Sequence, residues 1–429
     1  MKQFLIFIVL FSTINFIMCT HEPRSIQIDA DFPGGNIIVD SIYGDTIFLR
    51  QDLRDTEGNW FYWSFRIQGA ANRTLCFNFS NGAVIGSRGP AISTDEGISW
   101  RWIGDLGYSD TKFQYTFGPE ENDVYFSQGM NYTEKDLDRF LQKHKDHPDL
   151  KLETLCVSKK GREVELVRIS NKDKRPDFKI FLSARHHCGE MMASYVLEGI
   201  IDMALSNTEE GRWLREHGDF FIVPFVDKDG VEDGDQGKNR RPHDHNRDYK
   251  LRIYPEINAI TMQVPEWTDN KPVFFLDMHC PWLRGGSDGD HPDKGNEFVF
   301  FAGNDPANDT GNFVEKLHRF SSILELSNKG GSIPYRASFN LLYGLSWNTA
   351  ANRKKSDFQS SSDWGRTLPN AVFASSIEIP FANASGVVVD AETGRELGNN
   401  LAIAIKIYLE SLKKENELSY FEETEKFSK

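Results

Sequence analysis

A histidine and a glutamate three residues apart in "SARHHCGEMM" (residues 183–192) have the types and spacing of two metal ligands. One helical turn would project His187 and Glu190 in the same direction and leave His186 pointing elsewhere. A catalytic zinc ion takes three protein ligands and leaves one position for water. The chain has 11 His and 63 acidic residues, so such a pair also arises by chance. A third ligand therefore has to come from another segment.

Two later histidines are candidates for that third ligand. His279 follows the apolar run "VFFLDM", and His245 lies in "PHDHNRDY". Each can equally be a buried structural histidine, but His279 is favoured because α/β proteins place functional groups just beyond strand ends. A metal hydrolase also needs a base. Glu378, in the apolar run "FASSIEIPF", is the candidate, because a carboxylate in such a strand is costly to bury unless it is paired or used.

The segment between these candidates is rich in arginine. Residues 227–249 read "DKDGVEDGDQGKNRRPHDHNRDY" and include Arg240, Arg241 and Arg247. A guanidinium group offers a fixed fork of donors to a carboxylate or a carbonyl. Taken alone, the segment is most simply a solvated charged loop.

The elements that must position these residues fall into two parts. Residues 22–129 contain short aromatic and β-branched runs separated by Gly, Asn and Asp, which is typical of a β-sandwich. The period becomes helical at "MNYTEKDLDRFLQKH", where Thr133 and Asp136 resemble a capping box, so we predict a domain boundary near Gly129. Apolar runs then predict strands at 177–184, 219–226, 271–278, 296–302 and 370–379, and helices at 190–205, 306–324 and 391–414.

This alternation predicts an α/β fold for residues 131–413, with a mostly parallel sheet flanked by helices. Sites in such folds lie at the C-terminal ends of the strands. Residues 414–429 are expected to form a polar, frayed tail.

Four motifs in this order resemble the zinc carboxypeptidases of the carboxypeptidase A family (M14 metallopeptidases). They are "RHHCGE", the arginine-rich segment, "LDMHC" and "SSIEIPF". The preceding β-sandwich and "MNYTEKDLDRFLQ" are similar to the cytosolic carboxypeptidase branch. The resemblance implies a zinc-carboxypeptidase-like mixed, mostly parallel sheet flanked by helices, preceded by an all-β sandwich domain.

The resemblance also implies a role for each matching residue. His187, Glu190 and His279 would bind Zn²⁺, and Glu378 would take a proton from the activated water and return it to the leaving amine. The other implied roles are substrate carboxylate binding by Asn246 and Arg247, polarisation of the scissile carbonyl by Arg240 or the adjacent Arg241, and orientation of a ligand histidine by Asp244.

The predicted function is therefore that of a zinc metallocarboxypeptidase acting on peptides or proteins with a free C-terminal carboxylate. Two alternatives stay open: a zinc amidohydrolase acting on cell-wall peptide or another non-protein amide, and a catalytically silent peptide- or glycan-binding protein on the same fold. Phe358 stands where the family often has a tyrosine, so a hydroxyl contact is in doubt. Basic residues 353–355 would favour an acidic residue at the substrate C-terminus, unless they form a solvated loop.

Composition and the first residues bear on partners and location. The net charge of −14 disfavours nucleic acid as a partner. Residues 1–19 read as a signal peptide, which predicts a secreted or periplasmic protein, with a membrane anchor or a lipid tether through Cys19 as alternatives. No other stretch approaches the ~18 apolar residues of a spanning helix. Cys188 and Cys280 each adjoin a proposed ligand, so either a disulfide or two free buried thiols is expected there.

Overall fold

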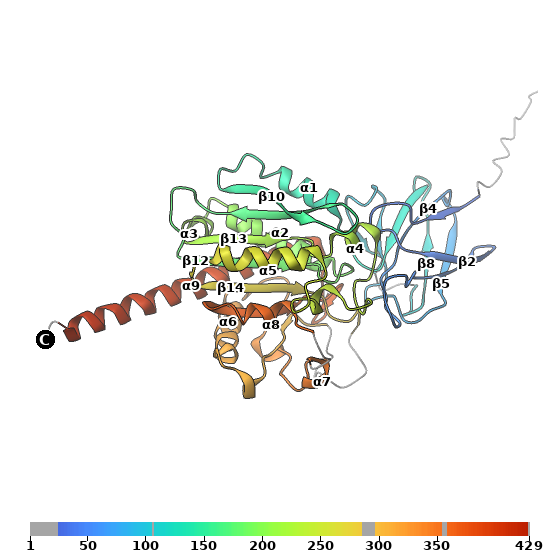
Figure 1. The fold of residues 1–429 in the computed structure, drawn as a ribbon. Coiled ribbons are helices and arrows are strands. Elements are labelled where there is room, and N and C mark those ends of the chain that lie inside the picture. Colours follow the sequence, from blue (N-terminus) through green and yellow to red (C-terminus); the bar gives the residue numbers. More distant parts are fainter. Residues whose placement is uncertain (1–24, 105–106, 285–296, 354–357, 428–429) are drawn as a thin grey trace, which may run out of the picture.

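The computed structural model describes residues 25–104, 107–284, 297–353 and 358–427. The predicted signal peptide, with Cys19, lies outside these residues. Along the chain a β-rich part comes first, and a larger body of strands and helices follows (Figure 1).

The N-terminal part consists of two β-sheets, as the sequence predicts. One has the strand order β1-β4-β9-β6-β7 and the other β2-β3-β5-β8. Apolar side chains alternate along β5, so that its buried face meets aromatic rings from other strands. The strands are β1 (Gln27–Asp29), β2 (Ile38–Tyr43), β3 (Thr46–Arg50), β4 (Ser64–Gln68), β5 (Thr74–Phe79), β6 (Ala91–Ser93), β7 (Arg101–Trp102), β8 (Lys112–Thr116) and β9 (Asp123–Ser127).

The second part is built on a seven-stranded sheet with the order β10-β11-β13-β12-β14-β16-β15. Its four central strands run parallel, and antiparallel pairing is confined to the edges. This confirms the predicted mixed, mostly parallel sheet. The central strands are β12 (Phe178–Ala184), β13 (Gly218–Val223), β14 (Val273–His279) and β16 (Ala371–Glu378), and the edge strands are β10 (Leu150–Val157), β11 (Glu163–Ile169) and β15 (Phe300–Phe301). A small separate hairpin pairs β17 (Asn383–Ala384) with β18 (Val387–Val388).

Helices cover both faces of this sheet, because successive residues of a buried strand point to opposite sides. Ile180 and Leu182 of β12 join one apolar cluster with helices α2, α6 and α9. Phe181 joins a second cluster with α5 and α8. The helices are α1 (Glu134–Gln142), α2 (Met192–Leu205), α3 (Glu209–His217), α4 (Lys228–Asp233), α5 (Pro255–Thr268), α6 (Phe313–Ser327), α7 (Ala350–Arg353), α8 (Ser361–Gly365) and α9 (Ala391–Phe427), with 3₁₀ turns η1 (His245–Arg247), η2 (Pro306–Asn308) and η3 (Ala337–Phe339).

Helices α2 and α9 cross in close contact because each has a glycine at the crossing. A Cβ on Gly199 would lie 2.0 Å from the carbonyl oxygen of Arg395, and one on Gly398 would lie 2.0 Å from that of Val196. Side chains at these positions would force the helices apart. This crossing anchors the helix that immediately follows the proposed HxxE pair.

Several predicted bounds differ from the structure. The helix expected from residue 190 begins at Met192, after a turn, and the helix expected from residue 306 begins at Phe313. The strand expected at 296–302 shortens to β15. The expected frayed tail is instead a continuation of α9 to Phe427, which projects beyond the body (Figure 1). Ion pairs four residues apart, from Glu410 to Lys406 and to Lys414, support the helix where its surface is solvated.

Among the described residues, no helix combines the length and the apolar character that crossing a membrane requires.

Candidate metal centre

Three parallel strands end at the same edge of the sheet and bring the predicted residues together. His279 is the last residue of β14, and Glu378 is the last residue of β16. The two are register partners on adjacent strands. His187 and Glu190 follow the end of β12, which pairs with β14 on its other side. The C-terminal edge of a parallel sheet therefore gathers residues from three distant segments, as expected.

The turn after β12 aims His187 and Glu190 in the same direction. Arg185 lies in the left-handed region (φ 63°) and is buried, and its Nε donates to the carbonyl oxygen of Cys188 at 2.8 Å. Bulky residues rarely adopt this backbone conformation, so the surrounding contacts must hold it. The amide of Glu190 donates to the carbonyl oxygen of His187 at 3.1 Å and closes the turn before α2 begins. A hydrogen-bonded turn, and not the first turn of α2, therefore produces the convergence.

The two candidate histidines converge on the third candidate ligand, Glu190. Nδ1 of His187 lies 3.0 Å from Oε1 of Glu190, and Nδ1 of His279 lies 2.8 Å from Oε2. Donor atoms of the three buried residues all lie within 4.8 Å of one another. Two imidazole nitrogens and a carboxylate are a donor set that suits zinc.

The far nitrogen of each candidate histidine faces a carboxylate. Nε2 of His279 lies 2.7 Å from Oδ2 of Asp277, and Nε2 of His187 lies 3.7 Å from Oδ1 of Asp244. A proton held on Nε2 leaves the Nδ1 lone pair for a metal, which is the usual arrangement behind a ligand histidine. Asp244 was expected in this role, whereas Asp277 was missed. Its spacing was a usable signal, because residues two apart on a strand share a face.

A second group of metal-binding types overlaps the first: His186, Asp277 and His279 also lie within 4.8 Å of one another. Both ring nitrogens of His186 already have partners, Asp277 at 2.8 Å and the Tyr249 hydroxyl at 2.8 Å. Neither His186 nor Asp277 lines the cavity onto which His187 and His279 open. The group with Glu190 is therefore the one that a metal and a substrate can share.

The charges of the site favour a bound cation. Burial opposes ionisation of Glu190, but the neighbouring Lys238 and the two candidate histidines hold its pKa well below the usual range. Burial likewise opposes charging of His279, yet Asp277 and Glu190 raise the pKa of this imidazole well above its usual value. Burial, reinforced by the negative charge of Glu190, raises the pKa of Glu378 to about 7. A carboxyl group poised near neutral pH suits a general base.

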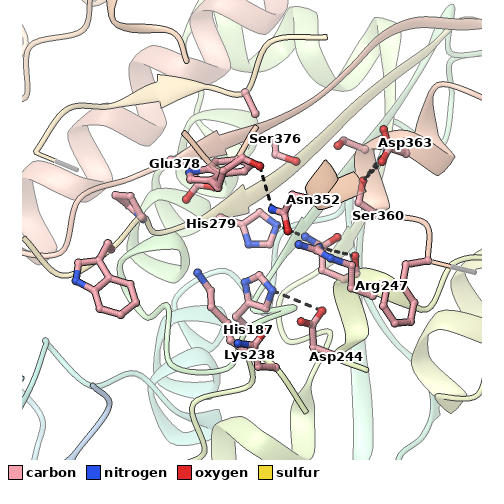
Figure 2. A pocket seen from close by; sticks show the side chains of 18 of the residues that line it. His187, Lys238, Asp244, Arg247, His279, Asn352, Ser360, Asp363, Ser376 and Glu378 are labelled. Carbon is pink, nitrogen blue, oxygen red and sulfur yellow. Dashed lines mark hydrogen bonds and ion pairs between the residues drawn. The ribbon is translucent and has the colours of Figure 1, made fainter. Parts of the chain in front are cut away.

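Two of the candidate ligands, His187 and His279, open onto a cavity of ≈ 420 Å³, a size typical of small-ligand sites. Figure 2 shows His187, His279 and Glu378 on one side of this cavity and Arg247 on another. Asn246 and Arg247, the predicted carboxylate binders, both line it. Phe358 also lines it, and no described lining residue is a tyrosine, so these residues offer no phenolic hydroxyl.

Other predicted residues are not brought to this cavity. Arg240 lies outside it, where its guanidinium pairs with three carboxylates, those of Asp55, Asp227 and Asp235. Arg241 is exposed and pairs with Glu57. The competing histidine, His245, is buried with its ring stacked 3.8 Å from that of Tyr254 and does not line the cavity. The helical turn η1 faces its successive residues in different directions, which separates His245 from Asn246.

Cys188 and Cys280 are both buried and free, so the structure has two thiols there and no disulfide. Of the basic residues 353–355, Lys354 and Lys355 lie outside the described residues.

Sequence reasoning missed several lining residues, among them Lys238 and Trp60. Lys238 is in the arginine-rich segment, but nothing in its neighbourhood distinguishes it from a solvated lysine. Trp60 comes from the N-terminal part and stacks against Trp282, with ring centres 5.2 Å apart. No local pattern could connect a residue of the β-rich part with a site more than a hundred residues away.

Comparisons with known proteins find similar sequences and similar folds. Residues 137–272 match the family model described as zinc carboxypeptidase. The chain is 26% identical over 350 residues to cytosolic carboxypeptidase 2 of Xenopus tropicalis, which covers 72% of this chain and 34% of that protein. The chain thus spans about a third of the length of several of the curated relatives it matches.

Solved structures extend the likeness to the N-terminal part. A metallo-carboxypeptidase from Burkholderia cenocepacia is 20% identical, with a TM-score of 0.71 over 90% of this chain and 100% of that chain. The metallo-carboxypeptidase from Pseudomonas aeruginosa in complex with (2-guanidinoethylmercapto)succinic acid is 22% identical, with a TM-score of 0.70 over the same shares. These structures establish the fold, including its N-terminal β-sheets.

Proposed function

We propose that this chain, which belongs to the zinc carboxypeptidase family, is a zinc-dependent exopeptidase that hydrolyses the C-terminal peptide bond of a peptide or protein. The observation that carries the proposal is a single cavity. It is lined by both histidines of the His–Glu–His donor set, by the buried carboxyl group of Glu378 and by the guanidinium of Arg247. The donor set and the carboxyl group support hydrolysis, and Arg247 supports cleavage at a chain end, since only a chain end offers a free carboxylate.

His187, Glu190 and His279 are the residues that would hold the metal. When bound, Zn²⁺ supplies Lewis acidity and lowers the pKa of a water molecule to about 7. The chain supports this fit with its own geometry, because both histidines present Nδ1 to Glu190 while a carboxylate faces each Nε2.

Glu378 is the general base in this proposal. Its carboxylate takes a proton from water as the water oxygen attacks the carbonyl carbon, and it later gives that proton to the leaving amine. Its place beside His279 at the sheet edge keeps it close to the proposed ligands without making it one of them. The raised pKa favours both halves of this exchange near neutral pH.

Arg247 and Asn246 set the position of the cut. Arg247 would bind the terminal carboxylate with its planar fork of donors. The side chain of Asn246 is held in place, because its Oδ1 accepts from the amide of Ser361 at 2.9 Å. A substrate anchored by its terminus presents its last peptide bond to the base, and tight positioning of this kind lowers the entropic part of the barrier.

A trimming assay tests the proposal. Matched peptides with a free or an amidated C-terminus are incubated with the zinc-loaded protein, and products are followed by mass spectrometry. We expect single residues to be released only from the free terminus, loss of release with a chelator, and recovery with zinc. Glu378→Gln should keep stoichiometric zinc while turnover falls by about 10²–10⁴-fold. Zinc-loaded protein that cleaves neither peptide would refute the exopeptidase assignment, and release from a muropeptide instead would identify an amidohydrolase.

A ligand of a protein with the same fold offers a second probe. The Pseudomonas aeruginosa protein is solved with (2-guanidinoethylmercapto)succinic acid, a dicarboxylic acid. Competitive inhibition by this compound that weakens in Arg247→Ala is the expected result, because this substitution removes the carboxylate anchor.

A further inference from the structure

The loop of residues 235–240, between α4 and η1, brings a positive charge into the cavity. Nζ of Lys238 lies 2.8 Å from Oε1 of Glu190 and 5.3 Å from the centre of the Trp60 ring. Figure 2 shows Lys238 and Arg247 on different sides of His187. Among the described lining residues, these two are the only lysine or arginine side chains.

Cleavage at a chain end places negative charge at two separate points. The terminal carboxylate is charged from the start, whereas the carbonyl oxygen of the last peptide bond gains its charge only in the transition state. A guanidinium that anchors the carboxylate binds substrate and transition state alike. A second cation at the carbonyl oxygen would strengthen as the reaction proceeds, which is the kind of interaction that accelerates it.

Resting on the exopeptidase function proposed above, we propose that Lys238 is the residue that stabilises this developing oxyanion. As water attacks, a C–O bond forms and the π pair of the carbonyl moves to its oxygen. The ammonium of Lys238 donates an N–H hydrogen bond to that oxygen and keeps its proton. The pair returns as the C–N bond breaks, and the amine takes the proton held by Glu378. An ammonium has three donors, so its contact with Glu190 leaves two for a substrate.

Arg240, the residue expected here from sequence, is already committed. Its Nε lies 3.1 Å from Asp55, and its two terminal nitrogens lie 2.5 Å from Asp227 and 2.9 Å from Asp235. Moving this guanidinium into the cavity would take its charge away from all three carboxylates, of which Asp235 alone keeps another arginine, Arg54, and this loss is strongly unfavourable for the buried Asp227. Its role is to fix the loop that carries Lys238.

The N-terminal part of the protein also fixes this loop. The carboxylate of Asp55 accepts from the amide of Gln236 at 3.2 Å and from that of Gly237 at 2.8 Å, as well as from Arg240. The neighbouring Thr56 donates its hydroxyl to the carbonyl oxygen of Lys238 itself. The residues on either side of Lys238 are therefore tied to a segment of the β-rich part.

The catalytic part holds the same loop from the other side. Gly237 has φ of 82°, and a Cβ there would lie 2.5 Å from the amide nitrogen of Cys188. Only glycine fits both the backbone conformation and this close approach. Lys238 thus extends from a short stretch held against the turn that carries His187, with its ammonium over Trp60.

The test compares binding of a transition-state mimic with binding of a ground-state ligand. Zinc-loaded wild type, Lys238→Met and Lys238→Arg are titrated with a phosphonate peptide, whose tetrahedral oxygens mimic the oxyanion, and with the product carboxylate. Lys159→Met is the matched control, since Lys159 also rests on an aromatic ring, that of Tyr254 at 4.1 Å, but is exposed and lies outside the cavity.

We expect Lys238→Met to lower kcat and phosphonate affinity together by about 10²–10³-fold, the range found when one oxyanion donor is removed. Product affinity and bound zinc should stay within about threefold of wild type, and Lys238→Arg should recover part of the loss. Unchanged phosphonate affinity in a zinc-replete Lys238→Met protein would overturn the assignment, and so would a loss explained entirely by lost zinc. An inactive wild type that also fails to bind phosphonate would instead overturn the exopeptidase function itself.

Asp55→Asn tests the positioning role of the N-terminal part through a double-mutant cycle. The substitution weakens the tie to Gly237 and to Arg240 without touching the cavity. Asp55→Asn should reduce phosphonate affinity in the wild-type background and have little further effect in the Lys238→Met background. Full additivity of the two losses would show that Asp55 does not act through Lys238.

Discussion

Asp277 is expected to control metal affinity without touching the metal. It is fully buried, and its carboxylate accepts from Ser183 at 2.8 Å, from His186 at 2.8 Å and from His279 at 2.7 Å. Asp277→Asn keeps the shape but replaces one acceptor oxygen with an NH₂ donor. That donor then opposes either the Nε2 proton of His279 or the proton of His186. If His279 escapes the conflict by moving its proton to Nδ1, it loses the lone pair that faces Glu190.

The magnitude follows from the hydrogen bond that is lost. A hydrogen bond to a charged group contributes about 1.5–3 kcal/mol, which corresponds to roughly a 10–100-fold change in a binding constant. Substitutions behind ligand histidines weaken metal binding by a similar factor. Asp244→Asn should have a smaller effect, because the separation of 3.7 Å from His187 is beyond a direct hydrogen bond.

The assay is a competition titration of zinc against a chromophoric chelator at fixed pH and ionic strength, on protein shown to be folded by circular dichroism. Tyr249→Phe is the matched control: it removes the hydroxyl that contacts His186 on the side away from the ligands, and should lower stability by about 1 kcal/mol while leaving zinc affinity unchanged. A folded Asp277→Asn protein that binds zinc as tightly as wild type would refute the role of Asp277, and with it the tautomer assigned to His279.

Two further predictions concern the cavity, and a third concerns the two buried cysteines. Because a general base must be ionised, kcat/KM should fall as pH drops through the pKa of Glu378, which burial raises to about 7. A bound divalent cation lowers that pKa, so the fall in kcat/KM on the acid side should lie below about pH 7. A value of kcat/KM that does not change with pH in this range would argue against the assignment. Arg247→Ala should raise KM for peptides with a free C-terminus by roughly 10–100-fold and leave any residual cleavage of amidated peptides unchanged. An equal effect on both kinds of peptide would show that Arg247 does not bind the carboxylate. Cys188 and Cys280 should resist alkylation in the folded protein and react after unfolding without a reductant, and a requirement for reductant would reveal a disulfide.

The arrangement of the sheet was predictable because it rests on long apolar runs. Strands β12 and β14 are buried along their whole lengths and β16 at all positions but one, and each was recognisable as a mostly apolar segment. The order of the segments then implied that their ends meet. The edge hairpin β10–β11 was missed, because its partly exposed first strand mixes polar and apolar residues. The helical continuation of α9 was missed because a polar helix supported by ion pairs has no apolar periodicity to recognise.

The residues of the site divide in the same way. Those at the ends of predicted strands, His279 and Glu378, are brought together at adjacent positions of the sheet. The sequence could not show which cation of the arginine-rich loop faces the cavity, since Arg240 and Lys238 are two residues apart and equally charged. What separates them is the direction imposed by Gly237 and by the carboxylates around Arg240, and one of those carboxylates belongs to Asp55.

The ties between Asp55 and the 235–240 loop also bear on how the chain can be divided experimentally. A fragment starting at residue 131 would retain all three proposed ligands and Glu378, yet it would lack Trp60 and the groups that tie down the Lys238 backbone. Metal uptake and turnover should therefore respond differently to truncation, the first surviving far better than the second. Exchanging the β-rich part for that of a distant relative would require exchanging the loop with it.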